Sequence, residues 1–395
     1  MIYLLVFILL LIPVVRYDWM AKTGGENVWY YLNLIVLILL AGLRYRVGGD
    51  TLMYMSMYNE WPAMDELKYF DFEEALYNPL WYIYTSVAKS ISDEFWVLQI
   101  IQAVIVNSIF FHFFKKYSPQ YYFSAILLYY LGYYCYFNME ILREVLCICV
   151  LMLATDWLIN KKWIRYYLAA SFAVCIHYSA AVMFVFPLLI LFFKKPSWQW
   201  QLIIISGVIV VLNMVNVAAL VISFLPVDEN MGELVEKYID VETNLNGMIA
   251  QLLKYLPLFG MIFIRAKHPN LHPDKFTPVV MGAVFAYGMS MGFAGFERLT
   301  NYFIPFIIVY IIHTIYYLIS SVNFKKMQVS MLAMYASIVV LFFNYGYYYL
   351  HDVSEFYPNT RYKIIFSPYY SILNPKIDEQ RERFIENYRK VSFMF

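Results

Sequence analysis

The segment FWVLQIIQAVIVNSIFFHFF, from Phe95 to Phe114, contains no Asp, Glu, Lys or Arg. As an α-helix it would be about 30 Å long, which matches the hydrocarbon thickness of a bilayer. A helix also satisfies its own backbone polar groups, which lipid cannot do. The segment therefore predicts a transmembrane helix.

The rest of the sequence has the same character. Of its 395 residues, 62% are hydrophobic and only 14% are charged, whereas soluble domains carry roughly 25% charged residues. Lys and Arg number 29 and Asp and Glu 28, so the basic surface typical of nucleic-acid binding is missing. We predict an all-α, polytopic integral membrane protein that is surrounded by membrane lipid and binds no nucleic acid.

Apolar runs recur along the chain, and we count about 12 transmembrane helices. A further apolar segment, Pro79–Ile91, would be only about 20 Å long as a helix, so we expect it to be interfacial or re-entrant. The expected spans are Ile2–Val15, Val28–Leu43, Phe95–Phe114, Tyr121–Phe137, Arg143–Ile159, Ile164–Ile176, Tyr178–Phe193, Trp200–Leu225, Met248–Ile264, Phe276–Ala294, Tyr302–Ile319 and Gln328–Leu350.

Basic residues in the short loops predict the orientation, because they collect on the cytoplasmic side. Neighbouring clusters are separated by two spans each, so all of them face the cytoplasm, and the loop with Arg16 and Lys22 joins them. The clusters are Lys115–Lys116, Lys161–Arg165, Lys194–Lys195, Arg265–Lys267 and Lys325–Lys326.

We expect residues 1–395 to form a single polytopic membrane domain with three polar regions on the outer face. Residues 44–94 form the first and include the short helix 79–91. Residues 226–247 form an acidic loop, and residues 351–395 form a C-terminal tail.

The remaining ionisable residues fall on the outer face in this topology. A charged group inside a membrane protein costs a few kcal/mol unless it is paired, so a group of them indicates function. We expect them to share one pocket open to the outer leaflet. They are Arg44, Arg46, Asp50, Glu140, Arg143, Glu144, His177, Glu297 and Arg298.

Several of these residues also have structural explanations. Arg143 could form a helix-end ion pair with Glu140 or Glu144. Arg46 could extend to a lipid phosphate.

The other ionisable residues of this group also have structural explanations. His177 could be a hydrogen-bonded packing residue, and Asp50, which follows two glycines, could be a turn or N-cap residue. Glu297 and Arg298 could simply end a span. We favour the shared pocket because so many separate explanations would have to coincide on one face.

The same positions resemble a known family, the EpsG-like, Wzy-type polysaccharide polymerases of bacterial envelopes. The most specific piece is the R-x-x-x-G-x-D pattern of Arg44, Gly48 and Asp50. The sequence departs from the family pattern at Glu144, where Gln is expected, and at Cys147, where Ala is usual. The matching pieces are LRYRVGGDTLMYMSMY (43–58), FNMEILREVL (137–146), HYSAAVMFVFP (177–187), ERLTNYF (297–303) and SPYYSIL (367–373).

The resemblance implies a GT-C-like glycosyltransferase in the bacterial inner membrane, with its active site on the periplasmic or extracytoplasmic side. Its partner would be an oligosaccharide linked to polyprenyl (undecaprenyl) diphosphate, and a chain-length regulator is a further candidate partner. Arginine guanidinium groups match phosphate oxygens and stabilise a diphosphate leaving group without a metal. We therefore expect neither a metal nor a cofactor.

The resemblance and the chemistry of the side chains together suggest roles for nine residues. A sugar hydroxyl is activated by a base within hydrogen-bond reach, for which His177 is the first choice and Asp50 the second. Glu140 would hold an arginine or a sugar hydroxyl. The candidate diphosphate ligands are Arg44, Arg143 and Arg298, and the candidate substrate-binding residues are Tyr54, Tyr369 and Glu297.

Three other functions compete with the polymerase. A flippase or another secondary transporter would need polar residues near the midplane and an inverted repeat, and the sequence shows no convincing repeat. A ligase for lipid-linked glycans would use the same substrates. An acyltransferase is less attractive because a serine nucleophile elbow is missing.

Overall fold

The structure, a computed structural model, describes residues 2–69, 78–193, 258, 260–262, 265, 275–292, 297–321 and 362–392. The chain divides into two compact units. The first contains Met1–Phe184 and Asn359–Ile385, and the second contains Val185–Pro358 and Glu386–Phe395. The single membrane domain expected from the sequence stays a prediction, and the expected loop 226–247 lies outside the described residues.

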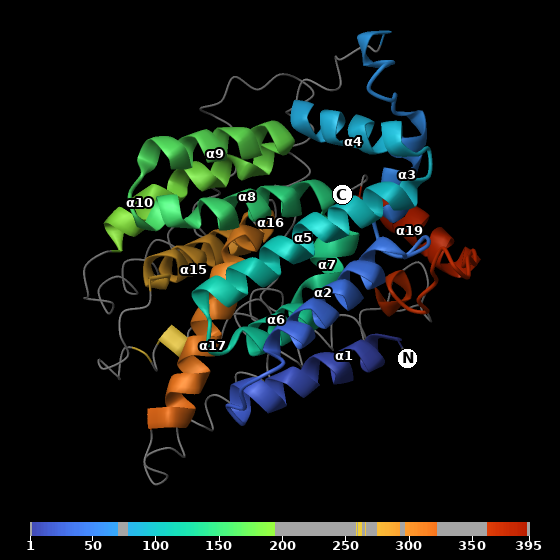
Figure 1. Cartoon of the computed structure of the whole chain (residues 1–395). Helices are drawn as coiled ribbons and strands as arrows, with labels where there is room; N and C mark the ends of the chain where they lie inside the picture. Colours follow the sequence, from blue (N-terminus) through green and yellow to red (C-terminus); the bar gives the residue numbers. More distant parts are fainter. Residues whose placement is uncertain are drawn as a thin grey trace. The chain divides into compact units, whose positions relative to one another are not determined.

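The first unit is built from helices that pack side by side (Figure 1). Short 3₁₀ turns accompany them at Leu67–Tyr69, Tyr178–Val185 (η4) and Tyr362–Ile365. The longer elements are α1 (Ile2–Pro13), the π-helical turn η1 (Val14–Trp19), α2 (Glu26–Gly42), α3 (Thr51–Glu60), α4 (Pro79–Ile91), α5 (Phe95–Tyr117), α6 (Tyr122–Gly132), α7 (Tyr134–Met139), α8 (Leu142–Ile159), α9 (Trp163–Ile176) and the part of α19 (Glu379–Ser392) up to Ile385.

The second unit is also helical in its described part. Its elements are α10 (Phe186–Phe192), α15 (Thr277–Gly292), α16 (Glu297–Thr300), the 3₁₀ turn Asn301–Phe303 and α17 (Ile304–Ser321). Phe186 stacks on Phe303 with ring centroids 4.7 Å apart. Leu189 of α10 approaches Gly282 of α15 so closely that a Cβ atom there would lie 2.4 Å from Leu189 Cδ1.

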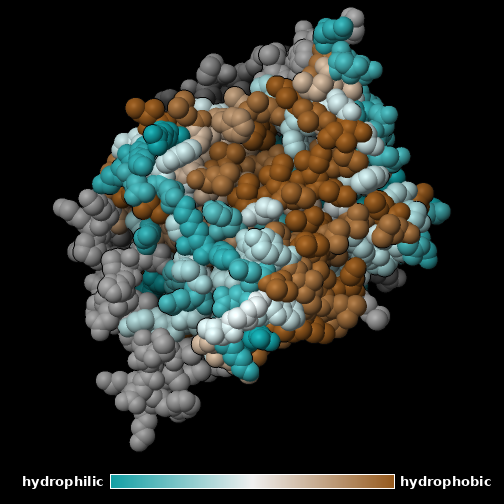
Figure 2. Space-filling view, in the orientation of Figure 1, coloured by the Kyte–Doolittle hydropathy of each residue, from teal (hydrophilic) through white to brown (hydrophobic). Residues whose placement is uncertain are grey.

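Several of the described helices have the apolar composition of membrane spans, and three also have the length. Within the described residues, three helical stretches qualify by length and hydropathy, namely Ile2–Trp19, Phe95–Tyr117 and Arg298–Tyr317, and five shorter apolar helices accompany them. Figure 2 shows apolar residues covering much of one face over α2 and α5, where Ile35 and Val104 are exposed. Over the described residues the structure confirms an all-α membrane-type fold, while the count of 12 spans and the GT-C architecture stay predictions.

Antiparallel packing of α2 and α5 defines the two ends of the first unit. Lys115 at the end of α5 donates a hydrogen bond to Asn27 Oδ1 at the start of α2, over 3.2 Å. At the opposite ends of these helices, Gly42 packs against Ile100, and a Cβ atom on Gly42 would lie 2.8 Å from Ile100 Cγ1. The C-terminal end of α5, with Lys115 and Lys116, therefore lies beside the N-terminal end of α2, which follows Lys22 in the sequence.

Helix α8 continues this arrangement. Near its C-terminus, Asp156 pairs with Lys116 of α5. Near its N-terminus, the Leu142 carbonyl accepts a hydrogen bond from Gln102 Nε2 of α5 over 2.8 Å. The basic residues around 22, 115 and 162 thus share one end of the unit, as the sequence-based orientation requires, and residues 42–50 and 140–143 share the other.

Two segments differ from simple spans. The apolar run 121–137 is divided into α6 and α7 at Gly132–Tyr133, because glycine is a weak helix former. Helix α4 is an antiparallel neighbour of α5, and its Tyr84 hydroxyl donates to Gln102 Oε1 over 3.0 Å. It is thus packed among the other helices of the unit and is short, as predicted for Pro79–Ile91.

Candidate active site

The loop after α2 is held by the C-terminal segment of the chain. The Tyr45 amide donates to the Tyr370 carbonyl, and the Ile372 amide donates to the Leu43 carbonyl, each over 2.9 Å. The Gly48 amide donates to the Ile365 carbonyl over 3.1 Å. Two sequence motifs more than 300 residues apart, 43–58 and 367–373, are therefore neighbours.

Gly48 brings this loop against the turn between α7 and α8. Its φ of +113° is a conformation that residues with a side chain rarely adopt. A Cβ atom on Gly48 would lie 2.4 Å from the Met139 carbonyl oxygen and 2.7 Å from Thr51 Oγ1. At the next position, a Cβ atom on Gly49 would lie 3.5 Å from Glu140 Oε2. The glycine pair therefore allows the loop backbone to touch the turn that carries Glu140.

Arg44 is an internal residue of this loop. Its side chain is buried, and it donates to the Ala41 carbonyl over 2.6 Å and to the Val47 carbonyl over 3.1 Å. Its Nη2 atom is buried and has no hydrogen-bond partner. Burial lowers the pKa of Arg44 to about 10, so it stays charged at neutral pH. Two of its donors stabilise the loop, and Nη2 is the nitrogen left without a partner.

Four side chains gather around the α7–α8 turn, and we call them the Arg143 cluster: Asp50, Tyr54, Glu140 and Arg143. The Arg143 guanidinium carbon lies 5.9 Å from the ring centroid of Tyr54, which is within cation–π range. Burial raises the pKa of Tyr54, and the charge of Arg143 lowers it. The Nε atom of Arg143 is buried and has no hydrogen-bond partner. Between described residues, no ion pair joins Arg143 to Glu140 or Glu144.

Glu140 is the electrostatically unusual member of the cluster. Burial, and to a smaller extent the negative charge of Asp50, raise its pKa to about 8. At pH 7 Glu140 is therefore mostly protonated and able to donate a hydrogen bond. Two carboxyl groups close enough to influence each other, one of them holding a proton, are a common basis for acid–base chemistry.

His177 lies at the same end of the unit as Arg143. The buried Cys147 thiol connects them, because its Sγ atom is 3.5 Å from the Arg143 carbonyl and 4.0 Å from the His177 carbonyl. Nδ1 of His177 accepts the Ser179 amide over 3.2 Å. Ser179 Oγ lies 2.7 Å from the same Nδ1 and can donate or accept. Since an amide can only donate, the amide contact favours the neutral tautomer with its proton on Nε2. In this form Nε2 is a hydrogen-bond donor, and the lone pair of Nδ1 is already used.

Other predicted residues lie apart from the cluster or in the second unit. Arg46 pairs with Glu382 of α19, so it does not extend to lipid. Tyr369 donates to the Leu40 carbonyl in the last turns of α2 over 3.0 Å. Arg298 is exposed on α16 of the second unit, which begins at Glu297. The roles proposed for these residues stay predictions.

Sequence reasoning missed a set of buried polar residues that position the cluster. Gln102 of α5 holds the start of α8 through the Leu142 carbonyl. Asn107 of α5 donates to Asn138 Oδ1 of α7 over 2.8 Å. The sequence did contain a sign of these contacts, because Gln and Asn side chains inside an apolar run indicate interhelical hydrogen bonds.

Arg381 was missed as well. Its side chain is only 1% exposed, and it donates to the carbonyls of Ile364, Pro368 and Arg46. Nothing in the alternating charges of the tail separates Arg381 from its exposed neighbour Arg383.

The fold and the cluster define a class of protein: a helical membrane protein with a candidate carboxyl- and arginine-containing site at the end of the first unit opposite Lys22, Lys115 and Lys162. Comparison with protein families is more specific. The sequence matches the EpsG family over residues 27–374, and the chain belongs to this family. The resemblance noted in the sequence is thereby confirmed. Neither the curated proteins nor the solved structures contain a significant match.

Proposed function

We propose that this protein is a polysaccharide polymerase. It transfers a growing glycan from polyprenyl diphosphate to a hydroxyl group of another lipid-linked repeat unit, at the outer face of the bacterial cytoplasmic membrane. Membership of the EpsG family supports this activity. The observation that carries the proposal is the Arg143 cluster, in which Tyr54 interacts with both the Arg143 guanidinium and the Asp50 carboxylate, and Asp50 in turn interacts with Glu140.

The location of the cluster supports the outer face. It lies at the end of the first unit opposite Lys22, Lys115 and Lys162. Basic residues in short loops mark the cytoplasmic side. The site also lies below the end of α5. Leu142, next to Arg143, is bound by Gln102 of α5, and Gln102 lies seven residues, or about 10 Å, along the helix from its first residue, Phe95.

In the proposed reaction the acceptor hydroxyl oxygen forms a bond to the anomeric carbon of the donor glycan. The bond between that carbon and the diphosphate oxygen breaks, and polyprenyl diphosphate leaves with the electron pair. The hydroxyl proton passes to a base. The main requirement is stabilisation of the charge that develops on the leaving diphosphate.

Arg143 is the leading candidate for that stabilisation, because Arg44 already uses two of its donors within its own loop. Asp50 becomes the leading candidate for the base, since the Nδ1 lone pair of His177 accepts the Ser179 amide. His177 would then orient a substrate oxygen through its Nε2 proton. Protonated Glu140 would donate a hydrogen bond to a sugar or phosphate oxygen.

The test is chain growth by the purified full-length protein in detergent, with an oligosaccharide on polyprenyl diphosphate and no ion gradient. Arg143→Ala should lower the rate roughly 100-fold or more, as loss of one such donor does elsewhere, and Arg143→Lys should lower it less. Arg165→Ala, an exposed arginine on α9, is the control. Full activity of a well-folded Arg143→Ala protein would refute the assignment, and binding of the substrate by the wild-type protein without elongation would favour a flippase.

A further inference from the structure

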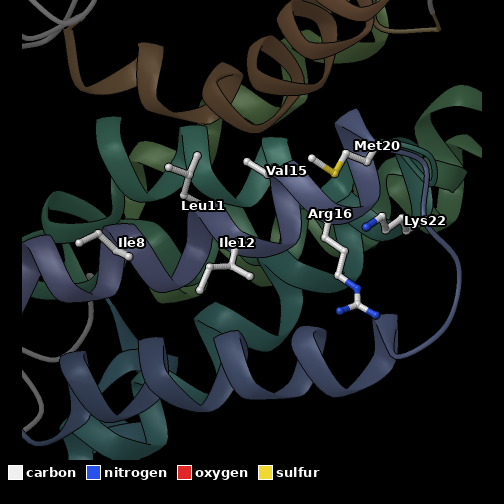
Figure 3. A pocket seen from close by; sticks show the side chains of 7 residues that line it. All are labelled: Ile8, Leu11, Ile12, Val15, Arg16, Met20 and Lys22. Carbon is white, nitrogen blue, oxygen red and sulfur yellow. The ribbon is translucent and has the colours of Figure 1, made fainter.

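A groove at the basic end of the first unit lies far from the Arg143 cluster. It has a volume of about 410 Å³ and is lined by Ile8, Leu11, Ile12, Val15, Arg16, Met20 and Lys22. All seven residues come from α1, η1 and the loop that follows (Figure 3). The groove is therefore a feature of one continuous segment.

The apolar part of the groove is one face of a helix. Residues 8, 11, 12 and 15 follow the spacing that places side chains in a row along a helix. The opposite face, with Val6, Leu10 and Pro13, is buried in the protein, whereas Ile8 and Ile12 are 48% and 42% exposed. From Ile8 to Arg16 the row is about 12 Å long, close to the roughly 15 Å depth of one leaflet.

The other end of the groove is cationic. The Lys22 amide donates to the Arg16 carbonyl over 3.1 Å, so the loop folds back and brings the two residues together. Both side chains are exposed. Within the described residues neither forms an ion pair with a carboxylate. Exposed Trp19 and Met20 lie between them in the sequence, and tryptophan is typical of the membrane interface.

We infer that this groove is a binding site for an anionic phospholipid of the cytoplasmic leaflet. An acyl chain packs along Ile8, Ile12 and Val15, and the headgroup phosphate contacts Arg16 and Lys22. The change from apolar to cationic side chains along one helix matches the change from chain to phosphate along a lipid. Basic grooves at this depth are typical of anionic headgroup recognition.

Native mass spectrometry of the full-length protein tests the inference. The protein is titrated with phosphatidylglycerol or, in parallel, with phosphatidylcholine of the same acyl chains. Each cation near an anionic surface strengthens binding roughly fivefold, so Arg16→Gln with Lys22→Gln should weaken phosphatidylglycerol binding roughly thirtyfold. The matched control is Lys162→Gln with Arg165→Gln, two exposed basic residues at the start of α9 on the same end of the unit, which should bind like wild type.

A second variant tests the apolar part of the groove while both cations remain. Ile12→Trp fills the groove and should also weaken phosphatidylglycerol binding. Equal binding of the two lipids by the wild-type protein would overturn the inference, and so would equal losses in the Arg16/Lys22 variant and its control. Full displacement of phosphatidylglycerol by inorganic phosphate would overturn it too, because it would indicate a phosphate site and not a lipid site.

Discussion

Arg381 donates a hydrogen bond from Nη1 to the carbonyl oxygen of Arg46 over 3.2 Å, although 335 positions separate the two residues. Beside it, the Arg46 side chain pairs with Glu382. Arg381 also binds the Ile364 carbonyl over 2.7 Å. One buried guanidinium group thus holds both the loop after α2 and the C-terminal segment, and the loop carries Asp50 to the Arg143 cluster.

Replacement of Arg381 should therefore release the loop. Arg381→Ala leaves buried carbonyls without donors, which should cost roughly 3 to 5 kcal/mol and lower both the melting temperature and the polymerisation rate. Arg383→Ala is the matched control, because Arg383 is exposed on the same helix. Similar behaviour of the two variants would contradict the role of Arg381.

Gly48→Ala should disturb the contact between the loop and the α7–α8 turn. The left-handed backbone alone should cost about 1 to 3 kcal/mol, and the new methyl group would overlap the Met139 carbonyl. We expect a lower melting temperature and a larger loss of activity than of stability. Gly132→Ala is the control, since a Cβ atom there meets nothing within 4 Å. An active, stable Gly48→Ala protein would show that the contact is dispensable.

Glu140 should make stability depend on pH. Because its pKa in the folded protein is raised from 4.5 to about 8, the folded state holds a proton that the unfolded state releases across this range. The stabilising contribution is complete below pH 4.5 and is lost as the pH rises through about 8. Melting temperatures of wild type and Glu140→Gln between pH 5 and 9 measure this effect.

The Gln variant should lose this part of the pH dependence, and Glu94→Gln, at an exposed position, should keep it. At pH 7 Glu140→Gln should also retain most of its activity, because glutamine donates a hydrogen bond as the protonated acid does. A parallel pH profile in Glu140→Gln and wild type would show that Glu140 titrates normally.

His177→Gln separates a donor role from a base role. The glutamine amide can donate a hydrogen bond in place of Nε2–H but cannot accept a proton. We expect His177→Gln to keep at least a tenth of the wild-type rate and His177→Ala to lose more. His112→Gln, at an exposed position on α5, is the control. Equal, complete loss of activity in both His177 variants, with unchanged melting temperatures, would restore His177 as the base.

Local composition predicts the helices well, because the bilayer demands apolar segments of a set length. The run from Phe95 to Phe114 lies within α5. Cys147 Sγ lies near the backbone carbonyls of both Arg143 and His177, while a pocket shared by their side chains stays a prediction. The ends of α2 and α8 at the cluster follow from the alternation of spans and basic loops.

The partners of individual side chains could not be predicted in the same way. A charged residue in the sequence carries no sign of whether it binds a backbone carbonyl, and Arg44 and Arg381 both do. The tautomer of His177 depends on the amide of Ser179, which is set by the local turn. Such features arise from tertiary packing, on which composition and spacing carry no information.

The joining of the loop after α2 to the segment 362–385 also has a consequence for biosynthesis. At 5 to 20 residues per second, the ribosome reaches Arg381 roughly 20 to 60 s after it has translated Arg46. Until then the loop lacks the carbonyl and amide partners that hold it against the α7–α8 turn. A nascent or prematurely terminated chain can therefore insert its first helices but cannot assemble the site before residues 362–385 have been made.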